Sequence, residues 1–144
     1  MFVKQISVFV ENKLGRLAEI TDVLGKKEIN IQAMSIADTM DFGILRLIVD
    51  KPQVALDALK EYGLTVKETE VVAVSLDNTP GALSNVLQKL FDNDISIEYI
   101  YDYAFAKHAD TNAVIVMRLG DQDEAVKKVQ ALGFTLITSE GAQN

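Results

Sequence analysis

Two short segments carry the residues best suited to binding chemistry. Phe9–Leu17 reads FVENKLGRL, and Ser75–Leu83, 66 positions later, reads SLDNTPGAL. Each contains an acidic residue, an Asn and a Gly, followed by a helical pattern. Glycine lets the backbone approach a guest closely, and the first amides of a helix favour a carboxylate because they lack internal partners. Asn can bind either a carboxylate or an ammonium, so each loop suits a zwitterion such as a free α-amino acid.

The same residues also suit an ordinary turn between a strand and a helix. In the second segment Thr79 precedes Pro80, which is a good helix start in which Thr caps and Pro takes the first helical position. The first segment has Lys13 and Leu14, which cap poorly. We therefore expect the first loop to leave its amides freer for a carboxylate, helped by Arg16, while a purely structural turn stays open for both loops.

The elements around these loops occur twice. A shift of 66 aligns residues 8–37 with 74–103, and a shift of 70 aligns the segments that follow residue 40. Each copy reads as strand, helix, strand, strand, helix, strand, since alternating apolar positions give way to helical spacing and back. We expect the change in shift to reflect a longer loop within 104–111.

This order predicts an α+β fold of two ferredoxin-like βαββαβ units, with antiparallel sheets and helices on one face. The predicted units are residues 1–69 and 70–144. A unit of about 70 residues buries only ~60% of its unfolded surface. We therefore expect the two units to pair within the chain, which creates a seam between them.

Composition narrows the function classes. The 144-residue chain has a formal net charge of -7 and clusters few basic residues, so a nucleic acid is not an expected partner. No apolar run approaches the ~20 residues of a membrane span, and the first residues lack the pattern of a secretory signal. The chain has no cysteine, which fits a reducing compartment, and we expect a cytoplasmic protein.

The two copies resemble the small-molecule-binding ACT domain. The resemblance is carried by ENKLGRL with EINIQAMSIAD in the first copy and by DNTPGALSNVLQKLFDNDISIEYIY in the second. It covers essentially the whole chain, although Leu14 stands where the family has Pro and Ser96 stands where the first copy has Asn30. It implies a non-catalytic regulatory protein that binds an amino acid between paired domains, without cofactor or metal. Its implied partners are the free amino acid, a second copy of the chain in a homodimer, and a separate regulated enzyme.

The resemblance also implies the contact residues. They would come from the two loops and from the second strand of the unit across the seam: Asn12, Leu14, Gly15, Arg16, Leu17, Asn78, Thr79, Pro80, Gly81, Ala82, Leu83, Asn30, Gln32, Met34, Ser35, Ser96, Ile100 and Tyr101. Since strand residues alternate faces, about half of the strand set would point away from a guest. For Met34 and Ile100 plain core packing stays open, and for Tyr101 edge-strand packing does.

Two other function classes stay open. One is an interaction module that pairs through strand edges without a small ligand. The other is an acylphosphatase-like enzyme, because those enzymes share the fold plan and hold phosphate with an Arg in the first loop, where Arg16 stands. Their glycine-rich loop is missing here, and Ala82 occupies the matching position in the second copy. The single histidine, His108, lies near Asp110 in the expected longer loop, which is too small a set for a metal site or a nucleophile with its base.

Overall fold

The chain folds into two compact units in the computed structural model, which describes residues 2–38, 41–104 and 112–138. One unit comprises Lys4–Thr69, and the other begins at Glu70 and includes the start of the chain. The elements follow the predicted order of strands and helices in both copies. The predicted α+β fold of ferredoxin-like units is confirmed.

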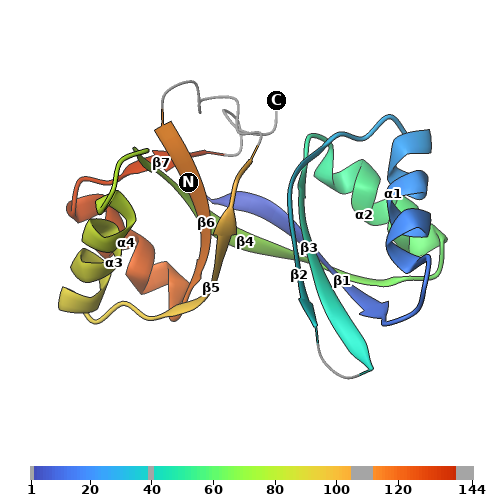
Figure 1. Cartoon of the computed structure of the whole chain (residues 1–144), viewed down its shortest axis with the longest axis horizontal. Coiled ribbons are helices and arrows are strands. Elements are labelled where there is room, and N and C mark those ends of the chain that lie inside the picture. Colours follow the sequence, from blue (N-terminus) through green and yellow to red (C-terminus); the bar gives the residue numbers. More distant parts are fainter. Residues whose placement is uncertain (1, 39–40, 105–111, 139–144) are drawn as a thin grey trace. The chain divides into compact units, whose positions relative to one another are not determined.

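The first unit is a four-stranded antiparallel sheet covered by two helices. It consists of β1 (Val3–Glu11), α1 (Arg16–Lys26), β2 (Ile31–Asp38), β3 (Phe42–Val49), α2 (Pro52–Glu61) and the beginning of β4 (Thr65–Asp77). The strand order is β2-β3-β1-β4, so β2 is the outer strand. Helices α1 and α2 lie on the same face of the sheet (Figure 1). Their buried side chains form one core with those of β1 and β3, including Ile6, Val8, Ile20, Leu24, Leu45, Leu47 and Leu59.

The second unit repeats this plan. It contains the rest of β4, α3 (Ala82–Asp92), β5 (Ile97–Asp102), β6 (Asn112–Leu119), α4 (Gln122–Ala131) and β7 (Thr135–Ile137). Strand β4 pairs with β7 and with β6, and β6 pairs with β5, so β5 is the outer strand. Its core combines residues of β4, β6, α3 and α4, including Val72, Val74, Val86, Leu90, Met117 and Val129.

Strand β4 differs from the expectation. Two separate strands, one closing the first copy and one opening the second, were expected; the chain instead forms one strand of 13 residues, Thr65–Asp77. Its sequence, TVKETEVVAVSLD, contains no Gly or Pro and is rich in β-branched residues, so nothing in it ends a strand. The contact boundary between the units, after Thr69, falls inside this strand.

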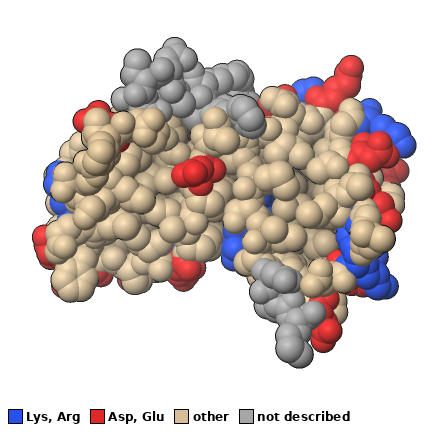
Figure 2. Space-filling view, viewed as in Figure 1, with Lys and Arg blue, Asp and Glu red and all other residues tan. Residues whose placement is uncertain are grey.

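Some expectations concern segments outside the described residues. The longer loop expected within 104–111, with His108 and Asp110, lies almost wholly there. None of the helices in the described part of the chain combines the length and the apolar character that a membrane span needs. On the face shown in Figure 2, the Lys and Arg side chains that are drawn lie close to Asp and Glu side chains rather than forming a broad basic surface.

Candidate functional site

The two repeated loops have the same backbone geometry. Helix α1 is preceded by Gly15 with φ 86°, and α3 is preceded by Gly81 with φ 87°. Both values lie in the left-handed region, which glycine adopts without the steric cost that a Cβ brings. Neither helix start has a side-chain cap. The glycine of each loop therefore sets the direction in which the helix begins.

Each loop leaves backbone amides without a partner. In the first, the Arg16 N–H donates to the Lys13 carbonyl over 3.3 Å, and the Glu19 N–H donates to the Gly15 carbonyl over 3.0 Å. Among the described residues, the amides of Leu17 and Ala18 between them make no hydrogen bond. These amides are the donors that a helix start offers to an anion.

The second loop is equivalent, which corrects one expectation. Thr79 does not cap α3, and Pro80 is not its first residue, because Gly81 takes the cap position and the helix begins at Ala82. The Thr79 carbonyl instead accepts a hydrogen bond from the Ala82 N–H over 3.2 Å. The amides of Leu83 and Ser84 make no hydrogen bond within the described ranges. The expected reason for preferring the first loop therefore does not hold.

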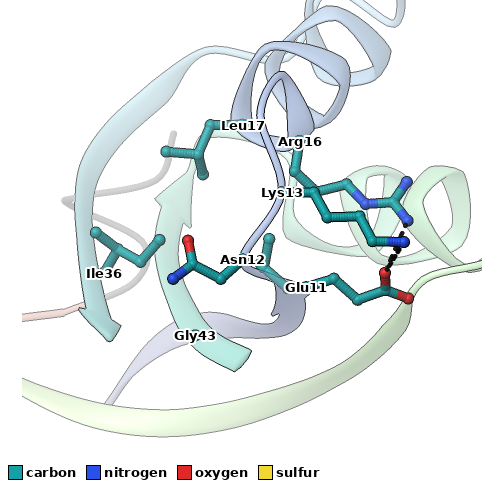
Figure 3. A pocket seen from close by; sticks show the side chains of 8 residues that line it. Glu11, Asn12, Lys13, Arg16, Leu17, Ile36 and Gly43 are labelled. Atoms are coloured by element: carbon teal, nitrogen blue, oxygen red, sulfur yellow. Dashed lines mark ion pairs between the residues drawn. The ribbon is translucent and has the colours of Figure 1, made fainter. Parts of the chain in front are cut away.

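A pocket of about 90 Å³ opens beside the first loop; we call it the loop pocket. Its lining combines the end of β1, the loop, the start of α1 and the hairpin strands: Val10, Glu11, Asn12, Lys13, Arg16, Leu17, Ile36 and Gly43. In Figure 3 the side chains of Asn12, Leu17 and Ile36 lie on one side of the loop, while those of Glu11, Lys13 and Arg16 extend together to the other. Since water occupies about 30 Å³ in the liquid, the pocket has room for the charged head group of a small metabolite.

The charged side chains of the loop neutralise one another. Lys13 Nζ lies 2.7 Å from Glu11 Oε2, and Arg16 lies 3.8 Å from the same oxygen and 2.9 Å from Glu19 Oε2. The Lys13 hydrogen bond, with the charges of Lys13 and Arg16, lowers the pKa of the Glu11 carboxyl below its ordinary value of 4.5. Two carboxylates therefore stand beside Arg16, and they would repel a phosphate of the kind that an acylphosphatase binds.

The predicted loop residues take different places. Asn12, Arg16 and Leu17 line the loop pocket, but Leu14 is fully exposed at the tip and is not part of the lining. Ile36 and Gly43 also line the pocket, and neither is among the residues predicted from the sequence. Strand pairing places Gly43 opposite Val10, and the Ile36 side chain lies 3.5 Å from where a Gly43 Cβ would stand. Only the register of the hairpin could have pointed to them.

In the first unit, the predicted residues of the second strand are not part of the loop-pocket lining. Asn30 precedes the start of β2, where Ile31 pairs with Val49, whereas the loop adjoins the opposite end of the strands. The Asn30 N–H donates to Asp50 Oδ1 over 2.9 Å, and Gln32 is buried. Ser35 lies opposite Arg46 in the middle of the hairpin.

Their counterparts in the second unit have local packing roles. The Ser96 side chain fills the space above Gly120, whose N–H donates to the Ser96 carbonyl over 2.9 Å. Tyr101 stacks on Tyr99, with ring centroids 6.5 Å apart. Met34 and Ile100 are only partly buried, with 46% and 40% exposure, so neither is plain core.

Comparison with known proteins places these features in a family. A family model described as an ACT domain pair matches residues 1–138. Protein BT0572 from Bacteroides thetaiotaomicron has a solved structure that is 40% identical in sequence, with a TM-score of 0.90 over 100% of this chain and 97% of that one. The search of curated proteins found no match.

More distant structures share the fold. The ligand-free regulatory subunit of aspartate kinase from Thermus thermophilus is 17% identical, with a TM-score of 0.61 over 90% of this chain and 92% of its own. The corresponding subunit from Thermus flavus is also 17% identical, with a TM-score of 0.59 over 89% of this chain and 90% of its own. The family match spans both units, and the resemblance noted in the sequence is confirmed: this chain belongs to the family of ACT domain pairs.

Proposed function

We propose that this chain is a non-catalytic regulatory protein that binds a free amino acid at its repeated loops. The observation that carries the proposal is the pair of unpartnered amides, Leu17 and Ala18, at the start of α1, together with the loop pocket that Asn12 and Leu17 line. These amides suit an α-carboxylate, and the amide group of Asn12 can bind either end of the zwitterion. The second loop offers the amides of Leu83 and Ser84 after the same left-handed glycine, and Asn78 stands at the sequence position that matches Asn12.

Regulation would follow from a difference in affinity between two arrangements of the protein. A ligand shifts such an equilibrium only by as much as it binds the two states differently. The structural likeness to regulatory subunits of aspartate kinases supports a regulatory role for this fold. We propose that the bound chain acts on a separate enzyme.

The proposal is tested by thermal denaturation of the chain against each amino acid in turn. At ten times its dissociation constant, a ligand that binds only the folded state stabilises it by about 1.4 kcal/mol. For a chain of this size we expect the melting temperature to rise by a few degrees with one amino acid or a small group of related ones.

Two variants identify the binding loop. Asn12→Ala and Asn78→Ala should each weaken binding at their own loop by about tenfold or more, since hydrogen bonds to charged groups contribute about 1.5–3 kcal/mol. Gln130→Ala, which removes an exposed amide on α4, is the matched control and should not change the shift. If no amino acid raises the melting temperature, an interaction module without a small ligand becomes the better description.

A further inference from the structure

A second pocket, of about 170 Å³, opens beside Arg16 in the first unit; we call it the aromatic pocket. Its lining comes from β1, β3, the start of α1 and the connection between α2 and β4: Phe9, Glu11, Arg16, Phe42, Gly63, Leu64 and Thr65. Asn12 and Leu17 line the loop pocket but not this one. Arg16 and Glu11 line both, and in Figure 3 both extend away from Leu17 and Ile36.

Two aromatic side chains stand half exposed in this pocket. Phe42 lies directly opposite Glu11, and Phe9, two residues before Glu11, is on the same face of the sheet. The exposed fractions of Phe9 and Phe42 are 50% and 56%. Ring surface left in water forgoes the stabilisation that burial would give, so two neighbouring rings in an open pocket call for an explanation.

The second copy shows that the fold does not require these side chains. Ser75 takes the position of Phe9 in the second copy: it pairs with Val114, as Phe9 pairs with Ile44. Asn112 takes the position of Phe42: it pairs with Asp77, as Phe42 pairs with Glu11. The position of Arg16 is taken by Ala82. The frame of the pocket, in contrast, is kept: Gly63 and Gly133 have φ 96° and 81°, and each is followed two residues later by Thr. The copies therefore differ at the two rings and the guanidinium.

The Arg16 guanidinium has hydrogen-bonding capacity to spare. It donates one hydrogen bond, from Nη1 to Glu19 Oε2, and its Nη2 lies 3.8 Å from Glu11 Oε2, beyond hydrogen-bond distance. A guanidinium carries five N–H donors, so several remain without a partner among the described residues. Glu11 and Glu19 beside Arg16 oppose an approaching anion, but Lys13 Nζ lies 2.7 Å from Glu11 Oε2. A singly charged carboxylate therefore meets less repulsion here than a doubly charged phosphate would.

We propose that the aromatic pocket binds a small carboxylic acid that carries one aromatic ring. The ring would lie against Phe9 and Phe42, where offset or edge-to-face contacts are favourable, and the carboxylate would accept hydrogen bonds from Arg16. The pocket volume suffices for the aromatic ring, because a cavity of about 150 Å³ accommodates benzene. This site goes beyond the amino-acid site at the repeated loops, since the second copy has no counterpart of it.

The test is calorimetric titration of the chain with phenylacetate and, separately, with L-phenylalanine. Both have the ring and the carboxylate, and only the second has an ammonium, which Glu11 could bind. We expect both to bind the wild-type chain at millimolar or lower concentration. Tighter binding of L-phenylalanine that Phe9→Ser with Phe42→Asn weakens would identify an aromatic amino acid as the ligand of this pocket. Equal or tighter binding of phenylacetate would identify a simple aryl carboxylate.

The residues at the matching positions of the second copy define the variants for this test. Phe9→Ser with Phe42→Asn installs the residues found at the matching positions, and it should weaken phenylacetate binding at least tenfold while the circular dichroism spectrum stays unchanged. Arg16→Lys keeps the charge but removes the planar pair of donors, and it should weaken phenylacetate binding several-fold. If the double variant does not fold, this single variant tests whether the pocket is a ligand site. Gln130→Ala, an exposed change on α4, lies in neither pocket and should leave phenylacetate binding unchanged.

The two sites can fail separately. If phenylacetate does not bind wild type, or binds a folded double variant as tightly as wild type, the aromatic pocket is not a ligand site. That result would leave the amino-acid shifts and their loss in Asn12→Ala untouched. If phenylacetate binds but no amino acid gives a melting-temperature shift that Asn12→Ala or Asn78→Ala removes, the proposed function fails and this inference stands.

Discussion

Glycine at the start of a helix has a measurable role in both loops. Gly15 has φ 86°, and a Cβ placed on it would meet nothing within 4 Å. Any cost of Gly15→Ala therefore comes from the backbone conformation alone, and we expect it to lower the free energy of unfolding by about 1–2 kcal/mol. Denaturation by urea measures this difference.

Gly25 is the control for that substitution. It lies within α1, outside the left-handed region, and a Cβ on it would also meet open space. Because alanine favours helix more than glycine does, Gly25→Ala should raise the free energy of unfolding by about 0.5 kcal/mol or more. Equal effects of the two substitutions would contradict a strained-backbone role for Gly15.

The Glu11 carboxyl makes the stability of the first unit depend on pH. Its pKa is lowered in the folded chain, mainly by Lys13, so the folded state binds this proton less readily than the unfolded state. The stabilisation that Glu11 gives the folded chain is therefore present when the pH is above 4.5, the ordinary pKa. It is lost as the pH falls through the lower pKa of the folded chain. The difference in unfolding free energy between wild type and Glu11→Gln should shrink as the pH is lowered from about 6 to about 3. In a Lys13→Met background the same comparison should show a weaker pH dependence, and an unchanged one would exclude Lys13 as the cause.

At the scale of elements, the sequence predicted the order of strands and helices, and it did so twice. The alternating apolar residues of β1 and the helical spacing of Ile20 and Leu24 are the positions that become buried. Such a pattern can be recognised within one short segment of sequence. The start of α3 was misjudged, because Thr79 and Pro80 are good starting residues and a left-handed Gly81 overrides them. The loop pocket was recognised only on its loop side, since Ile36 and Gly43 join it through hairpin register, which a local pattern does not contain.

In each copy, the residue before the second strand contacts the residue after the third strand, and this contact differs between the copies. The first copy joins Asn30 to Asp50, whereas the second packs Ser96 against Gly120, where a Cβ would collide with the Ser96 hydroxyl. Gly120→Ala should force the Ser96 hydroxyl out of its present rotamer, so we expect it to lower the unfolding free energy by about 1 kcal/mol or less. Adding Ser96→Ala should restore part of it in a double-mutant cycle, and strictly additive effects would rule out this contact.

At the scale of the whole molecule, both sheets have an outer strand with apolar exposure. On β2, Met34 and Ile36 are 46% and 48% exposed, and on β5 Ile100 is 40% exposed. Outer strands with unpaired backbone groups and apolar side chains favour association with another chain. We expect light scattering to give about twice the chain mass of 15.9 kDa. Met34→Lys with Ile36→Lys should shift the protein to the monomer, whereas Lys60→Ala, an exposed change on α2, should not. A wild-type monomer at all concentrations would contradict this prediction.

The uninterrupted β4 has a consequence for how such a protein can change over generations. Proteins built from modules usually exchange them at flexible connections, where a new joint disturbs no pairing. Here the contact boundary lies within 13 residues of continuous strand. A gene fusion that replaced one half would have to join the two sequences inside that strand. The new strand would have to keep the same side chains on the same face of the sheet. The two halves are therefore expected to be inherited together, drifting apart in side chains while their joint stays constant.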